Sequence, residues 1–327
     1  ASPLVDSPAY RAGIRAGDRI LRIGGKSTQG LSLEDAQERM RGKPKTPVVL
    51  TVVHPGEDKP TDIEIIREII HVPSVLGDTR NDDGSWNYFL AGHDRLAYLH
   101  IHTFGADSAK ELEKILDDLV GQGMRGLVLD LRNNPGGTLD AAIRTCDLFV
   151  SSGVIVTTRG RDGRIRRGEY ASGNARFTDF PIAILVNRST ASASEIVAAC
   201  LQDYGRAIIV GERTYGKGTI QEIIPLGEDL GEIKLTTTSY WRPSGTNIHR
   251  DRKATDADAW GVLPNPGYEV PVEGEELDKL ARWRYRRTLS KTTSAELPEP
   301  DDSLKGYFDP QLARAIQCLE QQARAGR

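Results

Sequence analysis

The chain has 327 residues, of which 38% are hydrophobic and 27% are charged, values that are typical of a globular protein. This length is sufficient for two domains with their own hydrophobic cores. The 43 basic and 46 acidic residues are spread throughout and give a net charge of −3. That balance argues against a nucleic acid or an anionic membrane surface as the main partner.

Cysteine usage and hydropathy exclude two further classes. Cys146, Cys200 and Cys318 lie in apolar or helical contexts and form no CxxC or His/Cys cluster, so we expect buried thiols and no metal site. The sequence has no run of 18 apolar residues that could span a membrane. It opens ASPLVDSPAY, without an initiator methionine or a signal peptide, and we therefore expect a mature or truncated product.

Residues 1–70 are predicted to form the first unit. SPAYRAG predicts a short helix, and RILRI predicts a strand that ends at a hairpin turn over Gly24 and Gly25, because glycine accepts a positive φ. LSLEDAQERMRG predicts a helix with Ser32 as its N-cap and Gly42 as its end. PVVLTVVHPG and TDIEIIREII predict two further strands.

Residues 71–275 are predicted to form a second unit in which strands and helices alternate. The apolar runs GLVLDLR and PIAILVN are typical of strands buried on both faces, and amphipathic segments between the strands predict helices. This order implies right-handed βαβ crossovers and a largely parallel sheet. Residues 276–327 are charged and contain spaced prolines, so we interpret them as a linker and a peripheral tail that ends in a helix.

A serine cluster in the second unit raises the question of a nucleophile. Residues 187–221 hold Ser189, Ser192 and Ser194, followed by Lys217 between two glycines. A serine hydroxyl needs a base within hydrogen-bond reach. None of the six histidines lies near these serines in sequence, although the fold could still bring one close. A lysine amine can also serve where desolvation favours its neutral form, but from the residues alone a plain turn lysine is the simpler interpretation.

Several spaced segments carry a resemblance to a known family. In chain order they are SPAYRAGIRAGDRILRIGG, LVLDLRNNPGG, STASASEI, QDYGRAIIVGERTYGKGTIQ and TSYWRPSGTNI, which cover residues 7–270. Together they resemble the carboxyl-terminal processing proteases, the tail-specific S41 peptidases with a Ser/Lys pair. The resemblance implies an α/β fold, with a PDZ domain before a βαβ protease core similar to Clp-type peptidases and crotonases. It also implies an extracytoplasmic serine endopeptidase, in the periplasm or cell envelope, that cleaves polypeptides near exposed C-termini.

The resemblance also assigns site residues. The middle serine of the family's run falls on Ser192, its base on Lys217, and the glutamine that holds the lysine on Gln221. The oxyanion donors fall on the amides of Gly137 and Ala193. A supporting shell, for which structural ion pairs are an equal alternative, comprises Gly136, Glu195, Asp203, Arg206, Glu212 and Thr214.

The helix after the nucleophile is predicted to begin near Ser194 and Glu195. We expect Ser194 to cap this helix, Glu195 to complement its dipole, and Ser189 to be a loop residue. The backbone amides at the helix start can face a developing oxyanion. No metal and no cofactor are expected.

The family's PDZ domain binds a C-terminal peptide as an added strand, with the carboxylate held by loop amides. Because six residues precede SPAYRAG, we expect the first PDZ strand and the carboxylate-binding loop to be missing. The helix over residues 31–41 would flank the groove, and its Leu33, Ala36 and Met40 are either groove or core residues.

Three alternatives stay open at this point. They are a non-catalytic ligand-binding module on the same core fold, a PDZ scaffold, and a crotonase-like acyl-CoA enzyme. None of them accounts for Ser192, Lys217 and Gln221 together. The physiological substrate, the cleavage-site preference and the oligomeric state, a homo-oligomer included, are not determined by the sequence.

Overall fold

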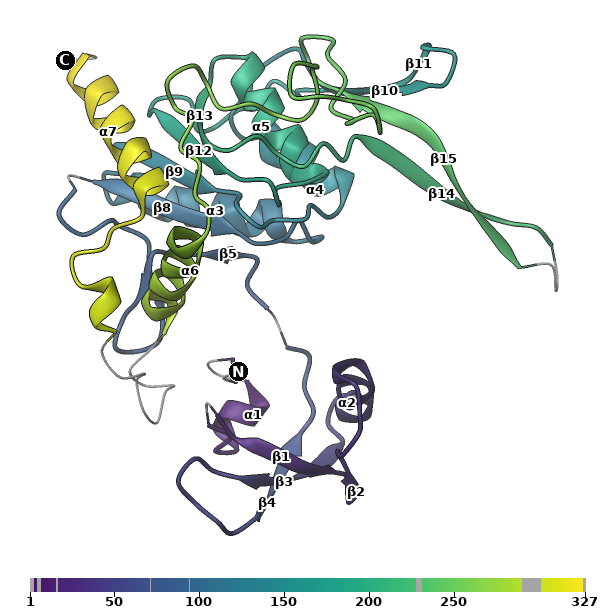
Figure 1. The fold of residues 1–327 in the computed structure, drawn as a ribbon, viewed down its shortest axis with the longest axis vertical. Coiled ribbons are helices and arrows are strands. Elements are labelled where there is room, and N and C mark those ends of the chain that lie inside the picture. The colour runs from purple at the N-terminus through teal and green to yellow at the C-terminus, as the bar shows by residue number, and fades with distance from the viewer. Residues whose placement is uncertain are drawn as a thin grey trace. The chain divides into compact units, whose positions relative to one another are not determined.

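The computed structural model describes residues 3–4, 7–15, 17–70, 72–93, 95–227, 231–289 and 301–325. The chain divides into two compact units (Figure 1). The first comprises Ala1–Val72, Thr79–Asn87 and Arg284–Lys305, and the second comprises Pro73–Asp78, Tyr88–Trp283 and Gly306–Arg327. Most of the segment expected to be a linker, residues 290–300, lies outside the described residues.

The first unit is built on a four-stranded antiparallel sheet with the strand order β2-β1-β3-β4. Its main elements are α1 (Pro8–Arg11), β1 (Arg19–Ile23), β2 (Lys26–Ser27), α2 (Leu33–Met40), β3 (Pro47–Val53) and β4 (Thr61–Ile66). A short strand pair, β6 (Thr79–Arg80) and β7 (Trp86–Asn87), and a 3-10 turn (Asp302–Leu304) also belong to it. Its small core comprises Ile23, Val48, Leu50, Val52 and Ile65.

Local sequence signals account for the first unit well. Gly24 and Gly25 have φ values of +56° and +77° and form the predicted two-residue hairpin turn between β1 and β2. Ser32 is the N-cap of α2, since its hydroxyl accepts the amide of Asp35 at 3.1 Å. The helix ends at Met40, slightly before the predicted stop.

The second unit is built on a five-stranded sheet with the order β13-β12-β9-β8-β5, in which β8, β9, β12 and β13 run parallel. Its strands are β5 (Val75–Leu76), β8 (Leu96–Ile101), β9 (Gly126–Asp130), β12 (Ile182–Val186) and β13 (Ala207–Gly211). The helices that connect the parallel strands are α3 (Ser108–Gly121), α4 (Leu139–Asp147) and α5 (Ala193–Asp203). Strands β9 and β12 are buried along their whole length, as their continuous apolar sequences predict.

Helices cover both faces of this sheet. Leu127 and Leu129 of β9 pack in one cluster with residues of α3, α4 and α5. Gly126 faces the other way, toward Leu319 of α7 (Pro310–Ala325). Buried residues of α7 include Leu312, Ala315, Ile316, Cys318 and Leu319. The C-terminal helix therefore forms a layer of the second unit, and the interpretation of this segment as a peripheral tail is wrong.

A second sheet extends from the same unit, with the antiparallel order β11-β10-β15-β14. Its strands are β10 (Val154–Gly160), β11 (Ile165–Tyr170), β14 (Thr219–Pro225) and β15 (Glu232–Trp241). The β14–β15 hairpin projects beyond the core of the unit (Figure 1). The remaining helix is α6 (Glu275–Thr288). No helix in the described part of the chain is long and apolar enough to cross a membrane.

Candidate active site

Ser192 lies between strand β12 and helix α5, at the carboxyl end of the parallel sheet. It is half-buried and occupies the N-cap position of α5 with φ +58° and ψ −116°. A non-glycine residue with positive φ is strained, and such strain persists only where the surrounding structure imposes it. The position resembles a nucleophile elbow, in which a sharp strand-to-helix turn presents a serine hydroxyl.

The loop after β9 lies against this serine because β9 and β12 are neighbouring parallel strands. Asn133 and Asn187 join the two loops: the amide of Asn133 donates to Asn187 Oδ1 at 3.0 Å, and Asn187 Nδ2 donates to Asn133 Oδ1 at 2.9 Å. The carbonyl of Asn134 accepts the amide of Ala191 at 3.0 Å. These bonds fix the loop relative to Ser192.

Two glycines let this loop approach the serine closely. Gly136 has φ +102°, and a Cβ atom there would lie 2.8 Å from Ser192 Cβ and 2.9 Å from the amide nitrogen of Ala193. Gly137 has φ +148°, and a Cβ atom there would lie 2.1 Å from the carbonyl oxygen of Phe104. Neither position can hold a larger residue without moving backbone atoms.

Two backbone amides at this point are unused. Among the hydrogen bonds of the described residues, the amides of Gly137 and Ala193 have no acceptor. Ala193 is the first residue of α5, where amides have no partner within the helix. Both amides are therefore free to donate to a ligand.

Glu195 connects the serine to the segment that holds Lys217. Its side chain is fully buried, and its Oε2 atom accepts the amides of Ser192 and Lys217, each at 2.8 Å. Its Oε1 atom accepts the hydroxyl of Thr214 at 2.5 Å and the amide of Gly216 at 2.7 Å. Burial raises the pKa of Glu195, although these four donors oppose the shift.

The backbone around Lys217 is tightly packed. A Cβ atom on Gly216 would lie 2.6 Å from Arg250 Cβ, and one on Gly218 would lie 2.3 Å from the amide nitrogen of His249. Glycine on both sides thus lets the segment lie against residues 248–250. The Lys217 side chain is exposed.

The structure brings the backbones of Ser192 and Lys217 to one carboxylate but does not join their side chains. Among the described residues, no hydrogen bond links the Lys217 amine to Ser192 or to Gln221. Gln221 is exposed on β14, where it pairs with Thr236 of β15 beside a bulge.

The family is shown by comparison with known proteins. The sequence model of peptidase family S41 matches residues 95–259, and a PDZ domain model matches residues 1–53. The chain belongs to peptidase family S41. This confirms the prediction of an S41 peptidase with a PDZ domain and a mixed α/β core.

Three relatives of this S41 chain are all called C-terminal processing proteases. A carboxy-terminal-processing protease of Bartonella bacilliformis is 38% identical over 97% of this chain and 70% of its own length. A carboxyl-terminal-processing protease of Synechocystis is 37% identical over 89% of this chain and 64% of its own length. A solved photosystem II D1 C-terminal processing protease is 29% identical with a TM-score of 0.50, over 90% of this chain and 72% of that one. The chain thus spans about two thirds of the length of these curated relatives.

Other predicted residues of the S41 core have structural partners. Asp203 accepts Arg242 Nη2 at 2.6 Å and the amide of Ser244 at 2.9 Å, so it connects α5 to the end of β15. Glu212 pairs with Arg188 at 2.6 Å. Arg206 Nη2 donates to the carbonyl of Phe177 at 2.8 Å. These side chains have the ion-pair or packing roles that the sequence left as an alternative.

The structure also tests the predicted roles of Ser194 and Ser189, the other serines of this segment. Ser194 does not cap α5, since Ser192 holds that position and the Ser194 hydroxyl donates to the carbonyl of Asn134 at 3.2 Å. Ser189 is an exposed loop residue, as predicted. The described histidines with ring hydrogen bonds find partners other than Ser192, such as Asp18 for His54.

Sequence reasoning missed the side chains that hold the S41 site loops together. Asn133 and Asn187 follow two buried strands, and polar residues at neighbouring parallel strand ends were the available signal. Arg132 also escaped notice, although a charged residue that directly follows an apolar strand needs a partner. One partner is the nearby Asp130, and the other two, Asp309 and Gln311, come from the distant C-terminal segment, which no local pattern could indicate.

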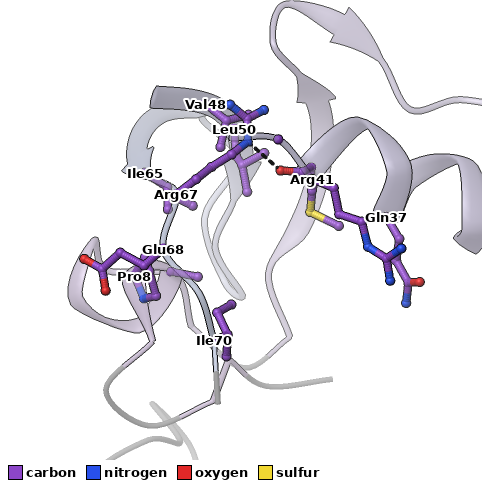
Figure 2. Close-up of a pocket in the computed structure, with 12 residues that line it drawn as sticks. Pro8, Gln37, Arg41, Val48, Leu50, Ile65, Arg67, Glu68 and Ile70 are labelled. Carbon is purple, nitrogen blue, oxygen red and sulfur yellow. Dashed lines mark hydrogen bonds between the residues drawn. The ribbon is translucent and has the colours of Figure 1, made fainter. Parts of the chain in front are cut away.

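The PDZ unit of the S41 chain contains a pocket of about 510 Å³ (Figure 2). Buried Val48, Leu50 and Ile65 form its apolar wall. It is also lined by Pro8, Ala9, Gln37, Met40, Arg41, Gly42, Arg67, Glu68 and Ile70. Among the described residues of this unit, strand β4 is the last strand of its sheet and pairs only with β3.

For three residues of α2, the sequence left open whether they belong to the groove or to the core, and the structure places each of them differently. Met40 lines the pocket and also packs against the small core, Ala36 packs against that core, and Leu33 is 75% exposed.

Proposed function

We propose that this chain is a serine endopeptidase that processes polypeptides near their C-termini through a Ser192/Lys217 pair. The observation that carries the proposal is the geometry at Ser192. Ser192 is strained at a helix start, beside Ala193 and the loop that ends at Gly137, whose amides have no acceptor among the described residues. Its own amide shares one carboxylate oxygen with the amide of Lys217. The names of the relatives support the substrate class.

In the proposed reaction the amine of Lys217 takes the proton of the Ser192 hydroxyl, which attacks a peptide carbonyl. The amides of Gly137 and Ala193 donate to the oxyanion that forms. The lysine then returns the proton to the leaving amine, and an acyl-enzyme remains. Water activated by the same amine releases the shortened chain.

Formation of the pair requires a side-chain movement. The exposed Lys217 amine must turn toward Ser192, and Gln221 is proposed to hold it there by a hydrogen bond. Catalytic hydrogen bonds are often absent in a ligand-free site and form with bound substrate. The short sequence distance from Lys217 into β14, which carries Gln221, supports this role.

The decisive test compares wild type with Ser192→Ala and Lys217→Ala on an unstructured polypeptide with an apolar C-terminus. Members of one catalytic unit fail together, so each variant should lose at least about 10³-fold in kcat/KM. Ser189→Ala and Lys234→Ala are matched controls, because both positions are exposed and outside the proposed pair. Both controls should retain wild-type activity.

Two outcomes would contradict the proposal. If Lys217→Ala cleaves as fast as wild type, another group is the base and the pair is wrong. If wild type binds the polypeptide without cleaving it under any condition that keeps it folded, the non-catalytic binding module on the same fold is the better description.

The extracytoplasmic location belongs to the same proposal and is supported by the family resemblance. Fractionation of the source cells, followed by detection of the chain, tests it. Recovery in the cytoplasmic fraction alone would overturn it.

A further inference from the structure

The C-terminal helix makes a buried polar contact with the strand that leads into the active-site loop. Arg132 lies two residues after the end of β9 at Asp130 and is 4% exposed. Its Nε atom donates to Asp130 Oδ1 at 3.0 Å, its Nη1 atom donates to Gln311 Oε1 at 2.9 Å, and its Nη2 atom lies 2.8 Å from Asp309 Oδ2. Two of its three partners therefore come from the start of α7.

Both partners at the start of α7 are themselves fixed. Asp309 and Gln311 are 0% and 1% exposed. Asp309 Oδ1 accepts the amides of Gln311 and Leu312 at 3.0 and 3.1 Å and so begins the helix. Gln311 Nε2 donates to the carbonyl of Val270 at 2.7 Å. The Asp309 and Gln311 side chains that contact Arg132 therefore cannot move unless α7 leaves its position on the sheet.

The charge of this arginine is well compensated. Burial by itself would lower the pKa of Arg132, but the carboxylates of Asp130 and Asp309 outweigh burial and raise it well above its ordinary value. The Tyr98 hydroxyl donates to Asp130 Oδ2 at 2.5 Å. Replacing a buried ion pair with apolar residues often leaves stability unchanged, so stability alone does not explain this network.

Arg132 is followed at once by the loop that approaches the serine. Asn133 has φ +59° and bonds to Asn187, and the loop ends at Gly137, whose amide is unused. An oxyanion donor must be aimed within about 0.5 Å of its productive position. A shift of Arg132 is passed to the loop through one peptide unit.

We propose that α7 is a positioning element of the active site, in which Asp309 and Gln311 hold Arg132 and thereby aim the Gly137 amide. Asp309 and Gln311 are positioning residues, since neither touches the reacting atoms. This inference rests on the proposed function, because the aimed amide is an oxyanion donor only if Ser192 is the nucleophile.

The test uses the full chain and three α7 variants. Gln311→Met removes the oxygen that faces Arg132 and keeps the length of the side chain. Asp309→Asn removes the second carboxylate and keeps the helix cap. Leu319→Ala is the matched control, because it weakens the packing of α7 while leaving Arg132 and its partners in place.

Four quantities are measured on each protein while it is folded: kcat and KM on a peptide substrate, thermal stability, and inhibition by a peptide aldehyde. The Ser192 hydroxyl adds to the carbonyl carbon of the aldehyde and forms a hemiacetal. The former carbonyl oxygen of the aldehyde then occupies the oxyanion position. We expect Gln311→Met and Asp309→Asn to lower kcat by about 10-fold to 100-fold. KM should stay within about twofold, and aldehyde affinity should fall by the factor lost in kcat. Leu319→Ala should lose thermal stability and keep kcat.

A conservative replacement of Gln311 tests whether kcat can be restored. Gln311→Glu keeps an oxygen toward Arg132 and is expected to keep most of the kcat that Gln311→Met loses. If either test variant does not fold, the remaining variant and this comparison still decide the question.

The inference is overturned if folded Gln311→Met and Asp309→Asn retain wild-type kcat, or if Leu319→Ala loses as much kcat as they do. Ser192→Ala, assayed in parallel, separates the two proposals. If Ser192→Ala retains activity, the proposed function fails. If it is inactive while the α7 variants remain fully active, the positioning role alone fails.

Discussion

At the scale of single residues, Glu195 is the group on which the proposed site depends most. Its two oxygens accept four donors, which come from Ser192, Thr214, Gly216 and Lys217. All four donors need a carboxylate with two accepting oxygens. The arrangement ties the start of α5 to the segment before β14 through one buried side chain.

Glu195→Gln therefore tests this junction. A glutamine has a single accepting oxygen, so two of the four donors would face its NH₂ group. We expect a loss of about 1–3 kcal/mol in the free energy of unfolding, because buried donors are left unsatisfied. We also expect kcat/KM to fall by roughly 100-fold, because the serine and the lysine segments lose their common support. Chemical unfolding and steady-state kinetics measure the two effects.

The control for this change is Glu212→Gln. Glu212 pairs with exposed Arg188 and has no hydrogen bond to Ser192 or Lys217 among the described residues. It should change stability by less than about 1 kcal/mol and leave kcat/KM unaltered. Equal losses of kcat/KM in both variants would show that the hydrogen bonds of Glu195 to the serine and lysine segments are not needed for activity.

The sequence predicted that Glu195 lies in the first turn of the helix after the serine, but it did not predict the hydrogen bonds that its carboxylate accepts. In the first turn of a helix an acidic residue is expected to complement the dipole. The structure adds that this carboxylate reaches the segment about twenty residues later, which has no local signature. Long-range hydrogen bonds of this kind depend on the packed fold and are invisible to helix-start patterns.

At the scale of elements, the strands and helices of the core were predicted from the sequence, but the cap of α5 was not. Strands β9 and β12 followed from their continuous apolar sequences and α3 from amphipathic spacing, and α4 and α5 were also predicted as helices. The start of α5 was predicted to within about one residue, but its cap was assigned to Ser194, because propensity rules do not anticipate a strained serine with positive φ at the N-cap. The ion-pair roles of Asp203 and Glu212 needed their distant partners to be known.

The loop between β9 and α4 offers an element-scale test in Gly136→Ala. The added methyl group would lie 2.8 Å from Ser192 Cβ and from the carbonyl oxygen of Ala191. Either the loop or the serine must move, and we expect kcat/KM to fall by about 100-fold. Gly163→Ala is the control, because this glycine also has positive φ (+75°) but no atom within 4 Å of the added methyl.

Both variants place alanine at a positive φ, a backbone conformation that L side chains rarely adopt, so both carry some strain. The activity difference between them thus isolates the contact with Ser192. Unfolding curves and kinetics on the same preparations supply the comparison. Full activity in Gly136→Ala would mean that the loop does not have to lie against the serine, and would remove support for Gly137 as an oxyanion donor.

At the scale of the whole molecule, the order of a PDZ domain and an S41 core was predictable because each carries sequence motifs of its own. The role of α7 was not. Its charged context indicated a tail, whereas its apolar residues Leu312, Ile316 and Leu319 cover one face of the central sheet. A sheet buried on both faces requires a second layer of helices, and only the fold shows which segment supplies it.

The two units have separate hydrophobic cores, and this separation leads to a test on the intact chain. Ile23 is 3% exposed in the core of the first unit, and Leu129 is fully buried in the core of the second. Truncation of either to alanine should cost about 2–5 kcal/mol in the unit that contains it. Hydrogen exchange of backbone amides can assign each loss to its unit.

Ile23→Ala should raise exchange only within residues 7–70 and leave cleavage of a short peptide unchanged, since the proposed catalytic residues all lie in the second unit. Leu129→Ala should raise exchange across the central sheet and reduce cleavage at temperatures where the second unit begins to open. If Ile23→Ala also raised exchange in β9 and β12, the two cores would unfold as one cooperative structure. If it instead abolished peptide cleavage while the second unit stayed protected, the first unit would have to contribute directly to the chemistry at Ser192, and a site confined to the S41 core would be incorrect.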